Sequence, residues 1–396
     1  MRKTGVVARG IRLPVLKKGD PLAEYVVDSL LAAAEAEGFS FRDRDVVGIT
    51  ESIVARTQGN VCSVDHIARD VARKTGGETV GVIFPILSRN RFSILLKGIA
   101  RGAKKLVLML SYPRDEVGNA LLGDEQILQA GIVPYSDVLT LDEYRNLFGH
   151  STHPVTGVDY VAYYQELVEA ENCEVEIIFG NHAEDILRYT DVVLTADIHT
   201  RAQSKRILLE KGASTVLGLD DIMSESIECS GYNPDYGLLG SNKATEETVK
   251  LFPRDGQALV EEIQQKLLEK TGRHIEVMVY GDGAFKDPQG QIWELADPVV
   301  SPFHTPGLVG TPNEIKLKYL TDNAFANLEG EALQQAIKDR IRAKAADLKG
   351  NMASQGTTPR QITDLLGSLC DLVSGSGDKG TPVVLVQGYF DSFATE

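Results

Sequence analysis

The chain has 396 residues, of which 43% are apolar and 24% are charged, so it is long enough for two or three globular domains. Its formal charge of −15 argues against nucleic acid and anionic membranes as partners, because both require a basic surface. An anionic ligand of such a chain needs a local basic pocket or a metal ion.

Targeting signals and cysteines indicate the cellular context. The longest apolar runs are far too short to span a bilayer, and the first residues lack the apolar core of a secretory signal. The four cysteines lie far apart and form no CxxC pair. We therefore expect a cytoplasmic protein with free thiols, no structural zinc and no membrane contact.

Residues 1–79 mix strands and helices. Apolar periodicity predicts a strand over residues 5–16, a helix over 21–37, a strand over 45–50 and a helix that ends near 75. Ser63 or Asp65 is a suitable N-cap for that last helix.

Residues 80–223 alternate regularly between strand and helix. Strands are predicted at residues 80–84, 105–110, 173–179, 191–196 and 215–219, and helices at residues 88–101, 158–170, 183–189 and 201–211. Apolar strands that alternate with helices form a parallel sheet covered on both faces. We therefore predict an inserted three-layer α/β Rossmann-like domain, although neither a GxGxxG nor a GxxxxGK[ST] motif is present.

Residues 224–396 return to the mixed pattern of the first 79 residues. Strands are predicted at residues 249–252, 277–280 and 382–387, and helices at residues 256–271, 361–373 and within the charged segment 313–349. Residues 1–79 and 224–396 together are predicted to form one α+β core with mixed or antiparallel sheets. Strands from both ends of the chain are expected to close this core.

One strand of this core ends in a group of carboxylates. The strand over residues 277–280 runs into Gly281-Asp282-Gly283, and Asp287 follows shortly after. Carboxylate oxygens at a sheet edge suit a hard cation such as Mg²⁺ or Mn²⁺. An Asp-Gly turn between two strands of a hairpin is the alternative interpretation of the same residues.

Three polar loops follow strands of the 80–223 block, at residues 88–91, 111–119 and 197–201. Ligands of open α/β sheets bind beyond the carboxyl ends of the strands. Our hypothesis is that these loops form an acceptor or nucleotide pocket that faces Asp282. The alternative is that each loop only caps a helix or forms a turn. His150 and His153 form a metal site only if further ligands join them.

Three longer segments match one pattern when they are taken in order: IRLPVLKKGDPLAEYVVDSL with DRDVVGITESIVARTQGNV, then GSNKATEETVKLFPRDGQALVEEIQQKLLEKTGRHIEVMVYGDG, then QITDLLGSLCDLVSGSGDKGTPVVLVQG. They resemble the coenzyme F420-0:L-glutamate ligase family, also called F420-0:gamma-glutamyl ligases. The family has "GD.LA..I" and "GDVVVVTQKIVSKAEG" in the first segment. It has "GVDESN", "LLPEDPD" and "VIVTDTFGRPWR" in the second, and "ADELASAAELVMG…GVPVVVVRG" in the third.

The resemblance implies a GTP-dependent ligase that forms an amide bond. The family activates an acceptor carboxylate, as an acyl phosphate, for attack by the amine of L-glutamate. It uses Mn²⁺ or Mg²⁺ and forms a homodimer. A metal of this kind polarises the γ-phosphoryl oxygens and neutralises charge during the transfer.

The resemblance also assigns nucleotide-binding residues. The expected lining of the guanine nucleotide is Leu13, Pro14, Val15 and Leu16. Glu51 and Ser52 occupy the family's nucleotide-binding pair, and Asn242 matches a nucleotide-contacting Asn. Arg56 stands at a phosphate-contacting lysine, so the positive charge is kept and a forked donor is gained. The nucleotide loop near the C-terminus corresponds to residues 374–380, with Gly375, Ser376, Asp378 and Lys379.

The metal ligands depart from the family pattern. Asp282 matches a metal-binding Asp, and we expect Asp282 and Arg56 to be catalytic. The other metal positions of the family fall on Leu239, Gly283 and Ser376, none of which is a carboxylate. Nearby carboxylates that can replace them are Asp235, Asp287 and Asp378.

These departures leave three functions open. The first is a GTP- and metal-dependent gamma-glutamyl ligase that acts on F420-0 or a related metabolite. The second is a folate or other amide ligase that uses ATP or GTP. The third is a nucleotide- or metabolite-binding homologue without activity.

Overall fold

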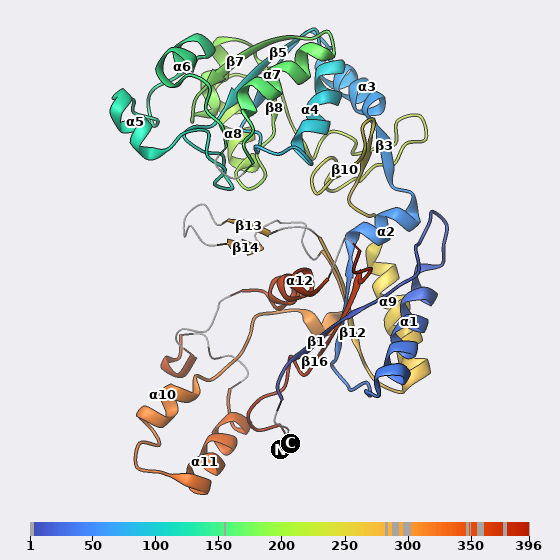
Figure 1. Cartoon of the computed structure of the whole chain (residues 1–396). Coiled ribbons are helices and arrows are strands. Elements are labelled where there is room, and N and C mark those ends of the chain that lie inside the picture. Colours follow the sequence, from blue (N-terminus) through green and yellow to red (C-terminus); the bar gives the residue numbers. More distant parts are fainter. Residues whose placement is uncertain are drawn as a thin grey trace.

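The computed structural model shows a mixed α/β protein with several sheets (Figure 1). It describes residues 4–153, 156–281, 284–286, 293–295, 302–345, 348, 350–354, 360–374 and 378–395. None of the helices in this described part of the chain is long and apolar enough to cross a membrane.

A five-stranded sheet joins the two ends of the chain. Its order is β1, β16, β2, β12, β15, with bounds Val7–Ile11, Val383–Gln387, Val46–Thr50, Glu276–Tyr280 and Phe303–His304. β1 pairs with β16, which confirms that strands from both ends close this sheet. Only β2 and β12 run parallel, and the other neighbours are antiparallel.

Helices cover both faces of this sheet because alternate strand residues point to opposite sides. Val47 and Ile49 of β2 pack against α1 (Leu22–Glu37) and α9 (Gly256–Thr271). Val46 of the same strand packs on the other face, against α12 (Ile362–Val373). These three helices were all predicted from apolar periodicity.

A six-stranded sheet forms the upper part of Figure 1. Its order is β6, β7, β5, β4, β8, β9, with bounds Leu139–Thr140, Glu174–Phe179, Lys105–Leu110, Thr79–Ile83, Val192–Thr195 and Thr215–Gly218. All neighbours except β6 and β7 are parallel, as the alternating pattern predicts.

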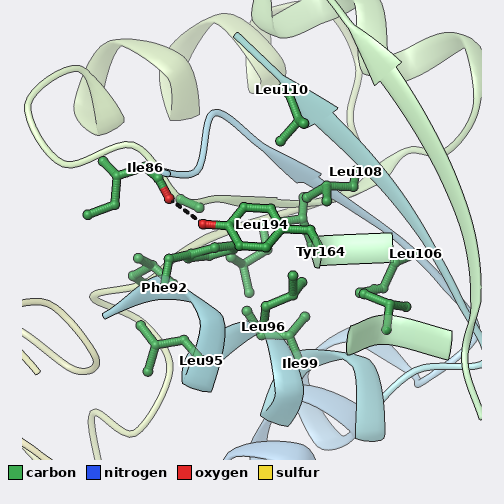
Figure 2. Packing of buried hydrophobic residues seen from close by; sticks show 14 of the residues in the cluster. Ile86, Phe92, Leu95, Leu96, Ile99, Leu106, Leu108, Leu110, Tyr164 and Leu194 are labelled. Atoms are coloured by element: carbon green, nitrogen blue, oxygen red, sulfur yellow. Dashed lines mark hydrogen bonds between the residues drawn. The ribbon is translucent and has the colours of Figure 1, made fainter. Parts of the chain in front are cut away.

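Both faces of the six-stranded sheet are buried. Leu106 and Leu108 pack under α4 (Phe92–Arg101) and α7 (Tyr160–Ala170), whose Tyr164 lies at the centre of Figure 2. Residues of the opposite face pack against the 3₁₀ helix η1 (Ala183–Arg188) and α8 (Arg201–Glu210). The core therefore explains why these strands are almost wholly apolar.

A small antiparallel sheet lies between the two larger ones. It consists of β10 (Asn242–Thr245), β11 (Thr248–Lys250) and β3 (Val61–Ser63). β3 continues directly into α3 (Val64–Thr75), where Ser63 and His66 form a capping box, so Ser63 is the N-cap. The helix α2 (Glu51–Gln58) precedes this sheet in the chain.

The remaining elements are short. They are α5 (Asp124–Ala130), α6 (Leu141–Phe148), β13 (Ala284–Lys286), β14 (Trp293–Leu295), η2 (Pro306–Leu308), α10 (Leu317–Asp322), α11 (Gly330–Arg342) and η3 (Met352–Ser354). β13 and β14 pair with each other antiparallel, whereas β12 pairs with β2 and β15, so this hairpin is not the one that an Asp-Gly turn after Tyr280 would form.

Several predicted bounds were wrong. The first strand ends at Ile11 rather than residue 16, because the chain then turns from the sheet toward α2. The helix predicted from residue 88 begins at Phe92, since the backbone N–H of Ser88 donates to the hydroxyl of Tyr164 (2.9 Å). Residues 183–188 form a 3₁₀ helix, and the segment 313–349 contains two separate helices.

The predicted domain division stays a prediction. It assigns residues 1–79 and 224–396 to one core and residues 80–223 to an inserted domain. The largest core cluster contains residues of α3, such as Ile67 and Val71, together with strands of the six-stranded sheet. It also contains Val249 and Leu251 from the small sheet.

The loops at the carboxyl edge of the six-stranded sheet are joined by two acidic side chains. Asp115 accepts a hydrogen bond from the backbone N–H of Leu87 (2.8 Å). Glu116 accepts hydrogen bonds from the backbone N–H groups of Ile198 and His199. Loops that follow β4, β5 and β8 therefore meet, and the pocket that they were predicted to form opposite Asp282 stays a prediction, because Asp282 lies outside the described residues.

Burial raises the pKa of Glu116 from its ordinary value of 4.5 to about 7. The hydrogen bond from Ile198 lowers the pKa, and the nearby charge of Asp197 raises it again. The pKa values of Asp115 and Asp197 are also raised, mainly by desolvation. This edge of the sheet therefore favours protonated carboxyl groups.

Gly98 sets the approach of α4 to α3. A Cβ atom at position 98 would lie 2.7 Å from Cβ and Cγ2 of Ile67. We predict that Gly98→Ala lowers the free energy of unfolding by about 1–3 kcal/mol, because overpacking outweighs the better helix propensity of Ala. Denaturant unfolding measures this change. In an Ile67→Gly background, which removes both of these Ile67 atoms, the same substitution should cost less than in the wild type, and stabilisation of the wild type would contradict the packing.

Glu116 should make stability depend on pH. Below about pH 4.5 the carboxyl is protonated in both the folded and the unfolded chain, so it has no effect. Between that pH and about 7 only the folded state keeps the proton, so stability falls as the pH rises. We expect the wild type to lose about 2–3 kcal/mol relative to Glu116→Gln between pH 5 and 8. Equal pH profiles of the two proteins in denaturant titrations would contradict this assignment.

Candidate functional site

The site is built where β2 ends and α2 begins. Thr50 is the last residue of β2 and the N-cap of α2, whose first two residues are Glu51 and Ser52. The parallel register pairs Thr50 with Tyr280 of β12, so both strands end at the same edge of the sheet. The N-terminus of α2 presents backbone N–H groups and a positive dipole end, which favour an anion.

Arg56 joins α2 to the segment after β1. Its Nε donates to the backbone carbonyl of Leu16 (2.6 Å), and Leu16 itself is buried. The two Nη nitrogens of Arg56 form no hydrogen bond with any residue that the structure describes. The forked end of the guanidinium is therefore available for a bidentate acceptor such as a phosphate.

Two lysines follow Leu16 and turn over the end of α2. The backbone N–H of Gly19 donates to the carbonyl of Thr57 (2.8 Å), which fixes this turn. Gly59 ends α2 with φ of +64°, and a Cβ atom there would lie 2.4 Å from Cδ of Lys18. Glycine at this position therefore lets the Lys18 side chain lie against the end of α2.

The hairpin of β10 and β11 forms the opposite wall. Asn242 of β10 lies opposite Lys250 of β11, and Lys250 also lies opposite Val61 of β3. The Nζ of Lys250 is 2.7 Å from Oε1 of Glu51, a carboxylate that is only 1% exposed. This ion pair ties the small sheet to the first residue of α2.

A cavity of about 680 Å³ lies between these walls. Its lining includes Ser52, Arg56 and Asn242, so three predicted nucleotide-binding residues come together here. Glu51 forms an ion pair with the lining residue Lys250, and the backbone carbonyl of Leu16 accepts a hydrogen bond from the lining residue Arg56. Figure 1 shows α2 next to β3 and β10, the elements that carry much of this lining.

The cavity is strongly basic. Its basic lining residues are Lys17, Lys18, Arg56, Lys243 and Lys250, and the lining within the described residues contains no carboxylate. Lys243 pairs with the exposed Glu246 (2.6 Å), and Lys250 with Glu51. The other three basic residues form no ion pair with the described part of the chain. A chain with a charge of −15 thus concentrates cations at one place.

The other predicted nucleotide residues lie elsewhere. Lys379 is exposed and lines a second cavity of about 900 Å³, together with Arg9 and Arg12. Asp378 is exposed next to it. The backbone N–H of Leu13 donates to the carbonyl of Gly380 (3.2 Å), so the Leu13–Leu16 segment meets the C-terminal loop. Pro14 and Val15 line neither cavity, and Val15 is 84% exposed. Gly375 and Ser376 lie outside the described residues.

The described residues do not assemble a metal site. Asp282, Gly283 and Asp287 lie outside them. Asp235 is exposed and lines neither cavity. Leu239, at the family's other metal Asp, is only 3% exposed and belongs to the largest core cluster. No group of three or more His, Cys, Asp or Glu in the described ranges is placed to hold a metal, and this includes His150 and His153.

Sequence reasoning missed four basic residues of the cavity: Lys17, Lys18, Lys243 and Lys250. Only Lys17 and Lys18 were identifiable, as an adjacent pair beside the Leu13–Leu16 segment in an acidic chain. Lys243 and Lys250 lie about two hundred residues away from them, and only the pairing of β11 with β3 brings them near α2. Cys229 was likewise missed, and it is the one exposed free cysteine of the four.

Comparison with known families agrees with the placement of these motifs. The F420-0:Gamma-glutamyl ligase family model matches residues 10–388. This range includes the strands of the six-stranded sheet and the residues that line the cavity. A search among curated proteins gives no match to the chain. The family match covers nearly all of the sequence, and it confirms the resemblance that the three segments indicate. The chain therefore belongs to the F420-0:gamma-glutamyl ligase family, whose enzymes form C–N bonds.

Proposed function

We propose that this ligase uses GTP to join L-glutamate to the carboxylate of F420-0 or a related metabolite, in the cytoplasm. The observation that carries the proposal is the basic cavity, in which Ser52, Arg56 and Asn242 lie together. These three residues were assigned to the nucleotide from two separate segments of the chain, Ser52 and Arg56 from one and Asn242 from the other. A volume of about 680 Å³ is within the usual range for small-molecule sites.

The charge of the cavity supports an anionic substrate. Nucleoside triphosphates, phosphorylated acceptors and glutamate all carry negative charge, and the whole chain repels them. The basic lining reverses this repulsion locally. It also places cations where negative charge collects during phosphoryl transfer, which lowers the barrier electrostatically.

The reaction has two steps. An oxygen of the acceptor carboxylate attacks the γ-phosphorus, and the bond from that phosphorus to the β,γ-bridging oxygen breaks, which yields an acyl phosphate and GDP. The amine nitrogen of glutamate then attacks the acyl carbon, phosphate leaves, and the amine proton passes to solvent. Arg56 is proposed to hold the transferred phosphoryl group with its two Nη nitrogens. The N–H groups of α2 orient the phosphates.

A divalent cation, Mn²⁺ or Mg²⁺, stays part of the proposal. Asp282 and Asp287 are its proposed ligands, and both lie outside the described residues. The buried Leu239 and the exposed Asp235 do not support the family's arrangement of metal ligands. The reaction steps above therefore do not involve the metal.

A homodimer and a separate domain at residues 80–223 are also proposals.

One observation favours a second candidate function. Leu239 replaces a metal ligand by a core residue, which is compatible with a homologue that binds nucleotide or metabolite without turnover. An amide ligase for folate or another acceptor, with ATP in place of GTP, has the same requirement for a basic cavity. Turnover separates these alternatives, because a ligase consumes nucleotide only when acceptor and glutamate are both present.

Arg56→Ala should reduce ligase activity. Loss of a charge-assisted hydrogen bond to phosphate costs about 1.5–3 kcal/mol, so we expect kcat/KM to fall about 10- to 100-fold. Arg56→Lys should retain part of the activity, because it keeps the charge and loses the fork. The assay follows GDP release with F420-0, L-glutamate and GTP. Arg206→Ala on the exposed surface of α8 is the control, and equal activity of both alanine variants would remove Arg56 from the site.

A further inference from the structure

We propose that Lys250 of β11 is a phosphate-binding residue of this ligase site and that Glu51 holds its ammonium group in place. The inference rests on the proposed function, because it assigns a role within the same basic cavity. The family resemblance assigns no role to Lys250. This residue lies on β11, in register with β10 on one side and β3 on the other.

The backbone of Lys250 is fixed from both sides. β11 is the central strand of its sheet, and Lys250 lies opposite Asn242 on one neighbour and Val61 on the other. Its side chain is only 13% exposed and lines the cavity. The ammonium group therefore has a defined position, unlike the lysines of the exposed turn at 17–18.

The partner of Lys250 fixes where the charge lies. Glu51 is the first residue of α2, and its carboxylate is 2.7 Å from Nζ of Lys250. An ammonium group has three N–H donors, so this bond leaves others for a ligand. Lys250 is thus held beside the first turn of α2, where the helix dipole and the hydroxyl of Ser52 also favour an anion.

The electrostatic balance requires such a cation. A buried carboxylate at the first residue of α2 would repel a phosphate at the same helix end. Lys250 neutralises it across the cavity. The family motif quoted above has Gln-Lys where this chain has Glu51-Ser52, so the lysine that the motif has in the first helix turn is replaced by Ser52, while Arg56 keeps the later positive charge. Lys250 brings an ammonium group to the same helix turn from the facing strand.

The test separates the ammonium group from the ion pair. Lys250→Gln alone would leave the buried Glu51 without this cation, so it risks misfolding. Glu51→Gln removes the carboxylate and keeps Lys250, and Glu51→Gln with Lys250→Gln removes both charges. We expect the double variant to bind inorganic tripolyphosphate at least tenfold more weakly than Glu51→Gln in isothermal titration calorimetry. Glu51→Gln with Lys250→Arg should recover most of the affinity.

A matched pair elsewhere provides the control. Lys105 and Glu176 of the six-stranded sheet are also 2.7 Å apart on neighbouring strands. Lys105→Gln with Glu176→Gln should leave tripolyphosphate affinity unchanged. Cys229 locates the bound anion, because it lines the cavity and is exposed while the other three cysteines are buried. Tripolyphosphate should slow its alkylation by uncharged iodoacetamide.

The outcomes distinguish the inference from the proposed function. If wild-type protein does not bind tripolyphosphate, or binds it without protecting Cys229, the cavity is not the phosphate site and both are overturned. If wild type is protected but the neutral double variant binds as tightly as Glu51→Gln, only the role of Lys250 is overturned. The proposed ligase function would then still be supported by Arg56 in the same cavity.

Discussion

The parallel pairing of β2 with β12 is the constraint on which the site depends. Because both strands point the same way, their carboxyl ends reach one edge of the five-stranded sheet. α2 begins there, and the chain after Tyr280 leaves the sheet at the same place. Two segments more than two hundred residues apart are thus joined. β16 pairs with β2 and β1 pairs with β16, so strands from both chain ends close the sheet beside them.

The second requirement is electrostatic. A protein with a charge of −15 cannot attract a triphosphate over its whole surface, so attraction must be local. The cavity achieves this with residues from the turn at 17–18, from α2 and from the hairpin of β10 and β11. Ion pairs hold part of this charge in position, and Arg56 lines the cavity without an ion pair to a described residue. The same cations that bind phosphate would also oppose its charge during transfer.

Long, strongly periodic elements were predictable from the sequence. The five parallel strands of the six-stranded sheet and the helices α1 and α9 follow from local pattern alone. The pattern also offered Ser63 or Asp65 as the cap of α3, and the structure has Ser63. The family match confirms that the three motif segments identify a gamma-glutamyl ligase. Ser52, Arg56 and Asn242 were named from those segments, and the structure brings them into one cavity.

Short elements and long-range pairs were not predictable. β3 has three residues, which is too few for a period to show. A strand was predicted at residues 249–252 and β11 lies at Thr248–Lys250, but its pairing with β3, which brings Cys62 and Val249 into the core, was not predictable. The bond between Lys250 and Glu51 spans 199 positions of sequence, and no local rule relates them. The start of α4 shifted because the hydroxyl of Tyr164 binds the preceding loop. Tertiary contacts determine the strand pairing, the ion pair and the start of the helix.

The most direct test of the account is the position of a bound nucleotide. A crystal structure with a non-hydrolysable GTP analogue and Mn²⁺ would show it. We predict that the phosphates lie in the cavity between α2 and the β10–β11 hairpin, within hydrogen-bonding distance of Arg56 and Ser52. Phosphate density in the other cavity, beside Arg9, Arg12 and Lys379, would contradict the central claim that the cations around α2 form the phosphate site.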